Sequence, residues 1–305
     1  MARLANSLKI SLDRYLDVYL QEVKAGIRCT EKGHKFSVGS FYIITRTVSI
    51  FKEFEKETNN LIDWKDINMQ FYYRFVQYLR DKGLRQNTIG KYLGTLKTIL
   101  SNAESEGYNK YYIYRNKRFK IGREPSTAIY LSHEELMAIE AVDLSGLPEV
   151  YSIARDIFLI GVFTAQRYSD YSTIRKSSIG YVSNKHPVLF VTQKKTGKRV
   201  CIPCNKALIS LLAKYDFNLP HIWTQHFNRY IKVVAQKAGL GERAQLVSSH
   251  TARRTGATLL YLAGMDILDI MKITGHSSSA MLKLYIKADE LEVAEKLIKK
   301  YPFFK

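Results

Sequence analysis

Apolar residues in the first third of this 305-residue chain recur at the spacing of a helix, and this pattern limits the fold more than any other feature. The stripes occupy residues 12–23, 41–54, 71–79 and 89–100. In the first of them, Leu12, Leu16 and Tyr19 lie on one helical face. The spacing predicts four helices that bury these stripes against one another, as a small helical bundle.

The second half is predicted to be mainly helical as well, with one β element. Ser132 and Glu135 form a capping box, which starts a new helix. Residues 188–193 and 199–203 are β-prone runs separated by a Lys-Lys-Thr-Gly-Lys turn, which predicts a hairpin. Further helices are expected to begin near Lys206, near Thr224, at Ser249, after Asp266 and after His276. The predicted fold class is therefore mainly α, with a small antiparallel β hairpin or sheet.

Residues 109–124 lose the helical pattern and mix six basic residues with aromatic ones. Two interpretations stay open, namely an extended segment that lies along a phosphate backbone and an ordinary solvated linker. Pro125 follows directly. We therefore expect a helical domain at 1–124, with this basic linker at its end, and a second domain at 125–305.

The charge balance predicts a polyanionic partner, because the chain carries a formal net charge of +19. Nucleic acid is the first choice, since each neutralised phosphate releases a counterion. A membrane surface is a weaker alternative, because no stretch approaches the ~20 apolar residues of a span. The three cysteines are too few for a disulfide framework, which suits a reducing cytosol.

Six polar residues in the second half are candidates for chemistry, because they stand in or beside otherwise apolar elements. In chain order they are Arg167, Lys195, His250, Arg253, His276 and Tyr285. The i, i+3 spacing puts His250 and Arg253 on one face of a helix. Arg167, with Asp170 three residues later, is either half of a structural ion pair or a guanidinium held in place for an anion. Taken singly, each residue is more often structural than catalytic, so the ordered set is what points to function.

At these residues the sequence resembles the tyrosine recombinases, the phage integrase family. The resemblance is carried by the stretches TAQRYSDYSTI, QKKTGKRVCIP, SSHTARRTGATLL and ITGHSSSAMLKLY, and it spans residues 125–302. It implies that the six residues above are the family's functional residues. Residues 1–124 look like the family's SAM-like core-binding domain, and the whole is most similar to integrases of Bacteroides-type mobile elements. One departure is Ala165, where many relatives have glycine.

The resemblance implies a site-specific recombinase that cuts and rejoins DNA. The Tyr285 oxygen would attack a phosphodiester and give a 3′-phosphotyrosine with a free 5′-hydroxyl. Arg167 and Arg253 would clamp the charge that develops on the non-bridging oxygens, each with two N–H donors. Asp170 would support Arg167.

The remaining residues are expected to move or share protons. His250 is the candidate base or orienting group for Tyr285, whose phenol must lose its proton as it attacks. Lys195 would protonate the departing 5′-oxygen, and His276 would be a second hydrogen-bond donor to the phosphate. Because one ester replaces another, no nucleotide is needed, and we expect neither a cofactor nor a metal.

A zinc site is the alternative that the cysteines raise. Cys201 and Cys204 form a C-x-x-C pair, and His221 and His226 follow in the order of a zinc finger. The gap from Cys204 to His221 is longer than in that pattern and contains a predicted helix. We therefore favour a small buried cysteine pair over a zinc site.

Two rival functions remain at this stage. A type IB topoisomerase-like enzyme would share the chemistry but relax supercoils without exchanging partners, and a non-catalytic helical protein would only bind DNA. The expected partners are double-stranded DNA and further copies of the chain, as a homo-tetramer on paired sites, with DNA-bending accessory proteins as further candidates. We expect no membrane partner and a bacterial cytoplasmic, nucleoid-associated location. Integrases of this type often carry an N-terminal arm-binding domain, whereas here residue 7 already enters the core-binding helices.

The tail after Tyr285 is predicted to be an amphipathic helix. Leu291, Ala294, Leu297 and Ile298 share one face, with Tyr301, Phe303 and Phe304 beyond them. Two interpretations stay open, namely a helix that packs on its own domain and one that docks on a neighbouring copy in a closed ring.

Overall fold

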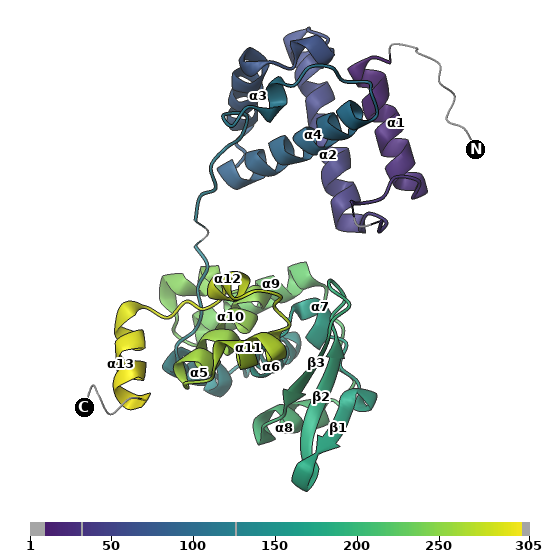
Figure 1. Cartoon of the computed structure of the whole chain (residues 1–305). Helices are drawn as coiled ribbons and strands as arrows, with labels where there is room; N and C mark the ends of the chain where they lie inside the picture. Colours follow the sequence, from purple (N-terminus) through teal and green to yellow (C-terminus); the bar gives the residue numbers. More distant parts are fainter. Residues whose placement is uncertain (1–9, 32, 126, 301–305) are drawn as a thin grey trace. The chain divides into compact units, whose positions relative to one another are not determined.

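The computed structural model describes residues 10–31, 33–125 and 127–300 of the chain. The chain divides into two compact units, Met1–Ser126 and Thr127–Lys305 (Figure 1). Each unit has its own hydrophobic core. Each unit is therefore described by itself. Among the described helices, none has the length and apolar character that crossing a bilayer requires.

Unit 1 is the helical bundle that the apolar stripes predict. Its described helices are α1 (Leu12–Ala25), α2 (Val38–Thr58), α3 (Met69–Asp81) and α4 (Gln86–Ser105), with the 3-10 turns η1 (Trp64–Asp66) and η2 (Ile113–Arg115). The predicted stripes are buried, with Leu12, Phe51 and Phe75 fully inaccessible to solvent. α1 begins where the Ser11 side chain accepts a hydrogen bond from a backbone amide, and it ends at the left-handed Gly26.

The segment 109–124 packs on unit 1 through two of its aromatic residues. Tyr114 and Phe119 are buried in the core of unit 1, and the Phe119 ring packs against Tyr72. The Tyr72 hydroxyl donates to the Lys120 carbonyl at 2.7 Å. The segment is therefore not a free linker, because Tyr114 and Phe119 supply core contacts. Its other two aromatic residues, Tyr111 and Tyr112, face solvent together with its basic residues.

Unit 2 is mainly helical, with one sheet. Its described helices are α5 (His133–Ala141), α6 (Val150–Thr164), α7 (Tyr168–Tyr171), α8 (Lys206–Lys214), α9 (Thr224–Lys237), α10 (Ser249–Leu262), α11 (Ile267–Thr274), α12 (Ser279–Lys283) and α13 (Glu290–Lys300), with the 3-10 turns η3 (Lys176–Ser178), η4 (Ser183–Lys185) and η5 (Gly241–Leu246). The capping box at the start of α5 is present, because Ser132 and Glu135 each bond the other's backbone amide. The helix starts predicted after residue 205 are confirmed.

The sheet has three antiparallel strands in the order β1 (Ile179–Val182), β2 (His186–Thr192) and β3 (Arg199–Pro203). The predicted hairpin is β2 with β3, in a register that pairs Leu189 with Ile202. β1 was not predicted from the sequence, because it has only four residues and none of them is buried. The β2–β3 hairpin places the 193–198 turn at the end of the sheet that meets α7 and α11.

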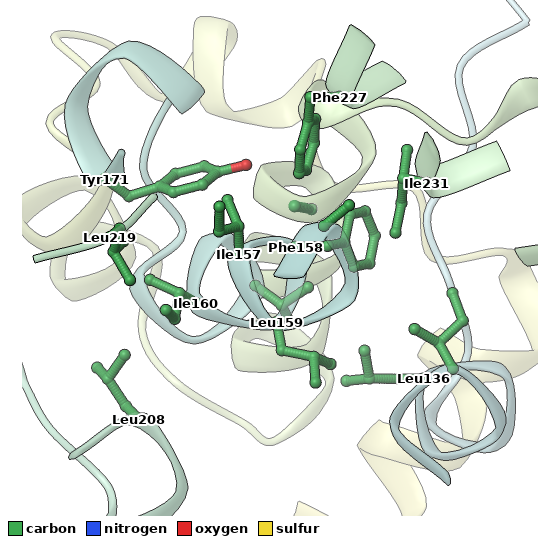
Figure 2. Close-up of a cluster of buried hydrophobic side chains, with 14 of the residues drawn as sticks. Leu136, Ile157, Phe158, Leu159, Ile160, Tyr171, Leu208, Leu219, Phe227 and Ile231 are labelled. Carbon is green, nitrogen blue, oxygen red and sulfur yellow. The ribbon is translucent and has the colours of Figure 1, made fainter. Parts of the chain in front are cut away.

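Helix α6 is the centre of the core of unit 2. Ile157, Phe158 and Ile160 on this helix are fully buried, and Figure 2 shows them among side chains of α5, α8 and α9. α10 approaches α6 closely at Gly256, where an added Cβ would lie 2.2 Å from the Val162 carbonyl oxygen. Glycine at this position therefore lets α10, which bears Arg253, pack backbone to backbone on α6, the helix that ends just before Arg167.

The cysteine prediction is only half right. Cys204 is buried, as expected, but Cys201 is exposed, because alternate residues of β3 face opposite sides of the sheet. Among the described residues, His, Cys, Asp and Glu side chains form no group of three or more that could hold a metal ion. The zinc-finger order of Cys201, Cys204, His221 and His226 therefore has no counterpart in the fold.

Candidate active site

Arg167 is positioned by a sharp change of direction between α6 and α7. α6 ends at Ala165, whose backbone is left-handed (φ 50°), and Arg167 is the extended N-cap residue of α7. Its Nη1 lies 3.8 Å from Asp170 Oδ2 and donates to Gln193 Oε1 at 3.3 Å. The other oxygen of Asp170 accepts a hydrogen bond from the Lys194 amide at 3.0 Å. The buried Asp170 thus holds Arg167 against the turn that follows β2.

Arg253, on α10, is fully buried, which is rare for arginine. Its Nη2 donates to the Thr274 carbonyl at 2.9 Å and lies 3.2 Å from His276 Nε2. Within the described residues, its Nε and Nη1 have no hydrogen-bond partner. Burial, and then the nearby Arg167, lower the pKa of Arg253 to about 10, so the guanidinium is still charged at neutral pH. A buried cation with two unpartnered donors is a site for an anion.

His276 follows the left-handed Gly275 at the end of α11 and is almost fully buried. The Thr274 hydroxyl donates to the Ile270 carbonyl at 2.7 Å, so His276 Nδ1, also 2.7 Å away, must donate its own proton to that hydroxyl. His276 Nε2 is then unprotonated and accepts from Arg253. Donation to a phosphate, the role expected of His276, would require a proton on Nε2.

The surroundings of His276 also lower the pKa of its side chain, which makes the stability of the fold depend on pH. Burial, and then Arg253, Arg167 and Lys198, lower its pKa to about 4 from the ordinary 6.5. The unfolded chain therefore binds more protons between these two values, and stability falls as the pH falls from 6.5 through 4.

When the pH is lowered from 7.5 to 4.5, we expect His276 to account for a loss of about 2–3 kcal/mol in the free energy of unfolding. Urea unfolding at both pH values should show that the wild type loses that much more than a His276→Gln variant. His250, whose pKa is also lowered, is present in both proteins and cancels from the comparison. Equal losses in the two proteins would show that His276 is not held neutral by the fold.

Tyr285 lies in the turn after α12 and is half-buried. Its ring centroid lies 4.7 Å from that of His276 and 5.3 Å from Arg253 Cζ. The Thr258 hydroxyl donates to the Tyr285 carbonyl at 3.3 Å, which ties this turn to α10. The fold therefore brings the phenol of the same chain up to the buried guanidinium.

His250 and Lys195 lie at the exposed side of this cluster. His250 is in the first turn of α10, and its pKa is lowered by partial burial, then by Arg254, Arg253, Arg167 and Lys195. The Lys195 side chain is exposed on the turn between β2 and β3. Lys195 is thus near enough to act on His250 electrostatically. The direct contacts are among Arg253, His276 and Tyr285.

Sequence reasoning missed two buried amides in this site. Gln166 and Gln193 are fully buried, and Gln193 Nε2 donates to Gln166 Oε1 at 2.7 Å. Gln166 Nε2 in turn donates to the Ile273 carbonyl at 2.7 Å, which fastens the end of α6 to α11. Both glutamines stand close to candidate residues in the sequence, Gln166 before Arg167 and Gln193 before the Lys195 turn. Nothing in the sequence distinguishes a buried glutamine at such a position from an exposed one.

Several solved structures share this fold. A lambda integrase dimer bound to a COC′ core site is 19% identical, with a TM-score of 0.69 over 89% of this chain and 97% of that one. The XerH site-specific recombinase bound to its difH substrate is 16% identical, with a TM-score of 0.65 over 97% and 98%. The Tn1549 transposon integrase in complex with a circular intermediate DNA is 14% identical, with a TM-score of 0.69 over 94% and 99%. At these identities the likeness shows the fold alone.

Family models identify the chain more directly, although no curated protein matches it. The phage integrase SAM-like domain matches residues 7–121, and the phage integrase family matches residues 217–292, which include His250, Arg253, His276 and Tyr285. The two matches together cover more than half of the chain. The chain therefore belongs to the phage integrase family, the tyrosine recombinases.

Proposed function

We propose that this chain is a site-specific DNA recombinase in which Tyr285 forms the covalent link to DNA. The observation that supports this most strongly is the buried Arg253, whose Nε and Nη1 have no partner among the described residues while its Cζ lies 5.3 Å from the Tyr285 ring. A phosphodiester placed there would satisfy both donors. It would also lie beside the one phenol that the predicted mechanism requires.

The charge around this point supports a phosphate as the ligand. Arg167 and Arg253 each lie close enough to lower the pKa of His276, and Arg254 Cζ lies 5.9 Å from the Tyr285 ring. The buried carboxylate beside them, Asp170, is held by Arg167 and a backbone amide. The positive charge is thus only partly balanced, and preorganised donors of this kind are worth most where charge develops in the transition state.

In the proposed reaction, the Tyr285 oxygen attacks phosphorus and the bond from phosphorus to the 5′-oxygen breaks. The phenol proton passes towards His250, and Lys195 delivers a proton to the departing 5′-oxygen. Rejoining is the reverse, with a 5′-hydroxyl of the same or a partner strand as the nucleophile. A phosphate on Arg253 would also favour a proton on His276 Nε2, which turns that nitrogen from an acceptor into a donor.

A substrate with a 5′-bridging sulfur tests the role of Lys195, because a thiolate leaves without a strong acid. We expect Lys195→Ala to cleave normal DNA at least about a hundredfold more slowly than wild type and to recover most of that loss on the sulfur substrate. Single-turnover cleavage measures both rates. Lys194→Ala, which removes the neighbouring exposed lysine of the same turn, is the matched control. A Lys195→Ala variant that stays slow on the sulfur substrate would make Lys195 a positioning or charge residue and not the acid.

We propose that 1–124 is the core-binding domain and 125–305 the catalytic domain. The outer face of the bundle is basic at Arg74, Arg80 and Arg85, all of which are exposed. Lys97 is not part of that face, because it donates to the Phe119 carbonyl at 3.2 Å and burial lowers its pKa. Double-stranded DNA is the proposed partner of both domains, with bacterial DNA-bending proteins as candidate helpers at the nucleoid.

The tail supports an assembly of several copies. α13 meets its own unit through Glu292, which bonds Tyr130, and Lys296, whose Nζ lies over the Tyr261 ring. Leu291 and Ile298, on the predicted apolar face, remain 76% and 47% exposed. A related lambda integrase forms a tetramer bound to a Holliday junction. We propose that this uncovered face packs on a neighbouring copy, whereas Tyr301, Phe303 and Phe304 lie outside the described residues.

Truncation after Asp289 should therefore weaken cooperative assembly on paired sites by at least about tenfold and leave half-site binding within about threefold. Leu291→Glu should have the same direction of effect, because it places a charge on the apolar face without removing the helix. Gel-shift titrations on half-sites and paired sites measure both. If half-site binding and pairing fall equally, α13 is a structural part of its own unit.

The number of DNA sites that the reaction requires distinguishes recombination from simple nicking and closing. Sequencing of DNA fragments covalently trapped on the protein would identify the site. Plasmids with one or two copies of it would then be incubated with the protein. We expect exchange products only with two copies. Relaxation of supercoils without exchange, on either plasmid, would favour the topoisomerase-like alternative.

A further inference from the structure

Gln193 lies at the base of the turn that bears Lys195. It follows β2 directly and is fully buried. Its backbone amide donates to the Lys198 carbonyl at 2.9 Å, and its carbonyl accepts from the Gly197 amide at 2.8 Å. The main chain of Gln193 therefore closes the turn, and its side chain points inward from that fixed base.

The side-chain amide of Gln193 is used at both ends. Oε1 accepts from Arg167 Nη1 at 3.3 Å and from Thr196 Oγ1 at 2.8 Å. Nε2 donates to Gln166 Oε1 at 2.7 Å and to the Thr274 carbonyl at 2.8 Å. The partners fix which atom is which, because a guanidinium only donates and a carbonyl only accepts. All four hydrogen-bonding positions of the amide are thus filled by protein groups.

The contact with Thr274 extends this network to the second arginine. The same carbonyl oxygen accepts from Arg253 Nη2 at 2.9 Å. The next residue, Gly275, has φ 75°, and an added Cβ there would lie 2.4 Å from Gln193 Nε2. Glycine at 275 is therefore required both by the left-handed cap of α11 and by the approach of the Gln193 amide.

We propose that Gln193 is a positioning residue that fixes Arg167, the Lys195 turn and, through the Thr274 carbonyl, Arg253 in one arrangement. This inference rests on the proposed function of those three cations. Gln193 itself has no free donor or acceptor for DNA, so it acts through the groups that it holds. An amide is required because only a group with a donor end and an acceptor end can bond a guanidinium and a carbonyl at once.

Gln193→Glu tests this with almost no change of shape. A carboxylate has no N–H, so it would face the Thr274 carbonyl and Gln166 Oε1 with lone pairs and would draw Arg167 into a tighter ion pair. We expect single-turnover cleavage to fall about a hundredfold, because an error of about 1 Å in a reacting group has an effect of that order. On the 5′-bridging sulfur substrate the rate should stay at least about tenfold low, since both arginines remain displaced.

Two further variants separate positioning from loss of fold. Thr196→Val changes an exposed residue and removes only the hydroxyl that ties the turn to Gln193, so its slower cleavage should recover on the sulfur substrate. Leu208→Ala removes buried side chain from the core of unit 2, away from the site. The Leu208→Ala variant should keep its cleavage rate within about threefold of wild type, at a temperature where circular dichroism shows that Leu208→Ala and Gln193→Glu are both folded.

Three results would overturn the inference, namely cleavage by Gln193→Glu near the wild-type rate, full recovery of that variant on the sulfur substrate, or an equal loss in Leu208→Ala. Each is measured with Tyr285 intact. Failure of the proposed function itself would appear separately, as covalent trapping that survives replacement of Tyr285.

Discussion

Tyr285→Phe abolishes strand cleavage while DNA affinity stays within about threefold of wild type, if the phenol oxygen is the nucleophile. The substitution removes one oxygen and keeps the ring that packs 4.7 Å from the His276 ring. No other group can take over, because the reaction requires a covalent bond from that atom to phosphorus. A substrate nicked near the cut, which loses its short 5′ fragment after cleavage, should trap wild type in a denaturant-resistant complex and leave the variant free.

The control for this experiment is Tyr230→Phe. Tyr230 is a half-buried tyrosine of α9 whose ring packs on Tyr151 in the same unit. It should trap DNA as wild type does. Trapping by Tyr285→Phe at any appreciable rate would assign the covalent bond to a different residue.

Arg253→Lys should slow cleavage by roughly 10³-fold, at the upper end of the effect of losing one preorganised donor. Lysine keeps the positive charge, but its three N–H groups share one nitrogen. It therefore cannot bond the Thr274 carbonyl and His276 and also present a planar pair of donors to a phosphate. DNA binding should fall far less, since many phosphate contacts share that free energy. A methylphosphonate at the cleaved position, which lacks one charged oxygen, should restore part of the rate of the variant.

Arg243→Lys is the matched control for that experiment. Arg243 bonds Glu135 and the Tyr130 carbonyl, so it is a structural arginine in the same unit. We expect it to cleave within a few-fold of wild type. If Arg253→Lys also cleaves at that rate, a bidentate clamp at Arg253 is not needed for the reaction.

Local patterns in the sequence predicted the helices well. The stripe that contains Leu12 and Leu16, and the capping box of Ser132 and Glu135, depend on residues within one or two turns, which sequence spacing records directly. β1 was missed because a four-residue strand has too few side chains to show alternation. The core positions of Tyr114 and Phe119 in segment 109–124 were not predicted, because basic residues surround them in the sequence.

The candidate site shows a similar division. Its candidate side chains were predicted in order along the chain through the resemblance, and the fold brings Arg253, His276 and Tyr285 into contact. The tautomer of His276 could not be predicted from the sequence. It depends on the Thr274 hydroxyl, which donates its proton to the Ile270 carbonyl of α11 and therefore accepts one from His276 Nδ1. Nor could spacing show that Ala165 stands in a left-handed conformation, which costs an alanine about 1 kcal/mol relative to glycine.

Mass spectrometry of the peptide that remains attached to DNA tests the central claim most directly. Wild-type protein would be trapped on the nicked substrate in buffer with EDTA and no nucleotide, then digested with trypsin and nuclease. The account predicts a nucleotide joined through its 3′-phosphate to Tyr285, within the peptide 284–287, and a free 5′-hydroxyl on the other strand end. A nucleotide on any other residue, or a link through a 5′-phosphate, would contradict it.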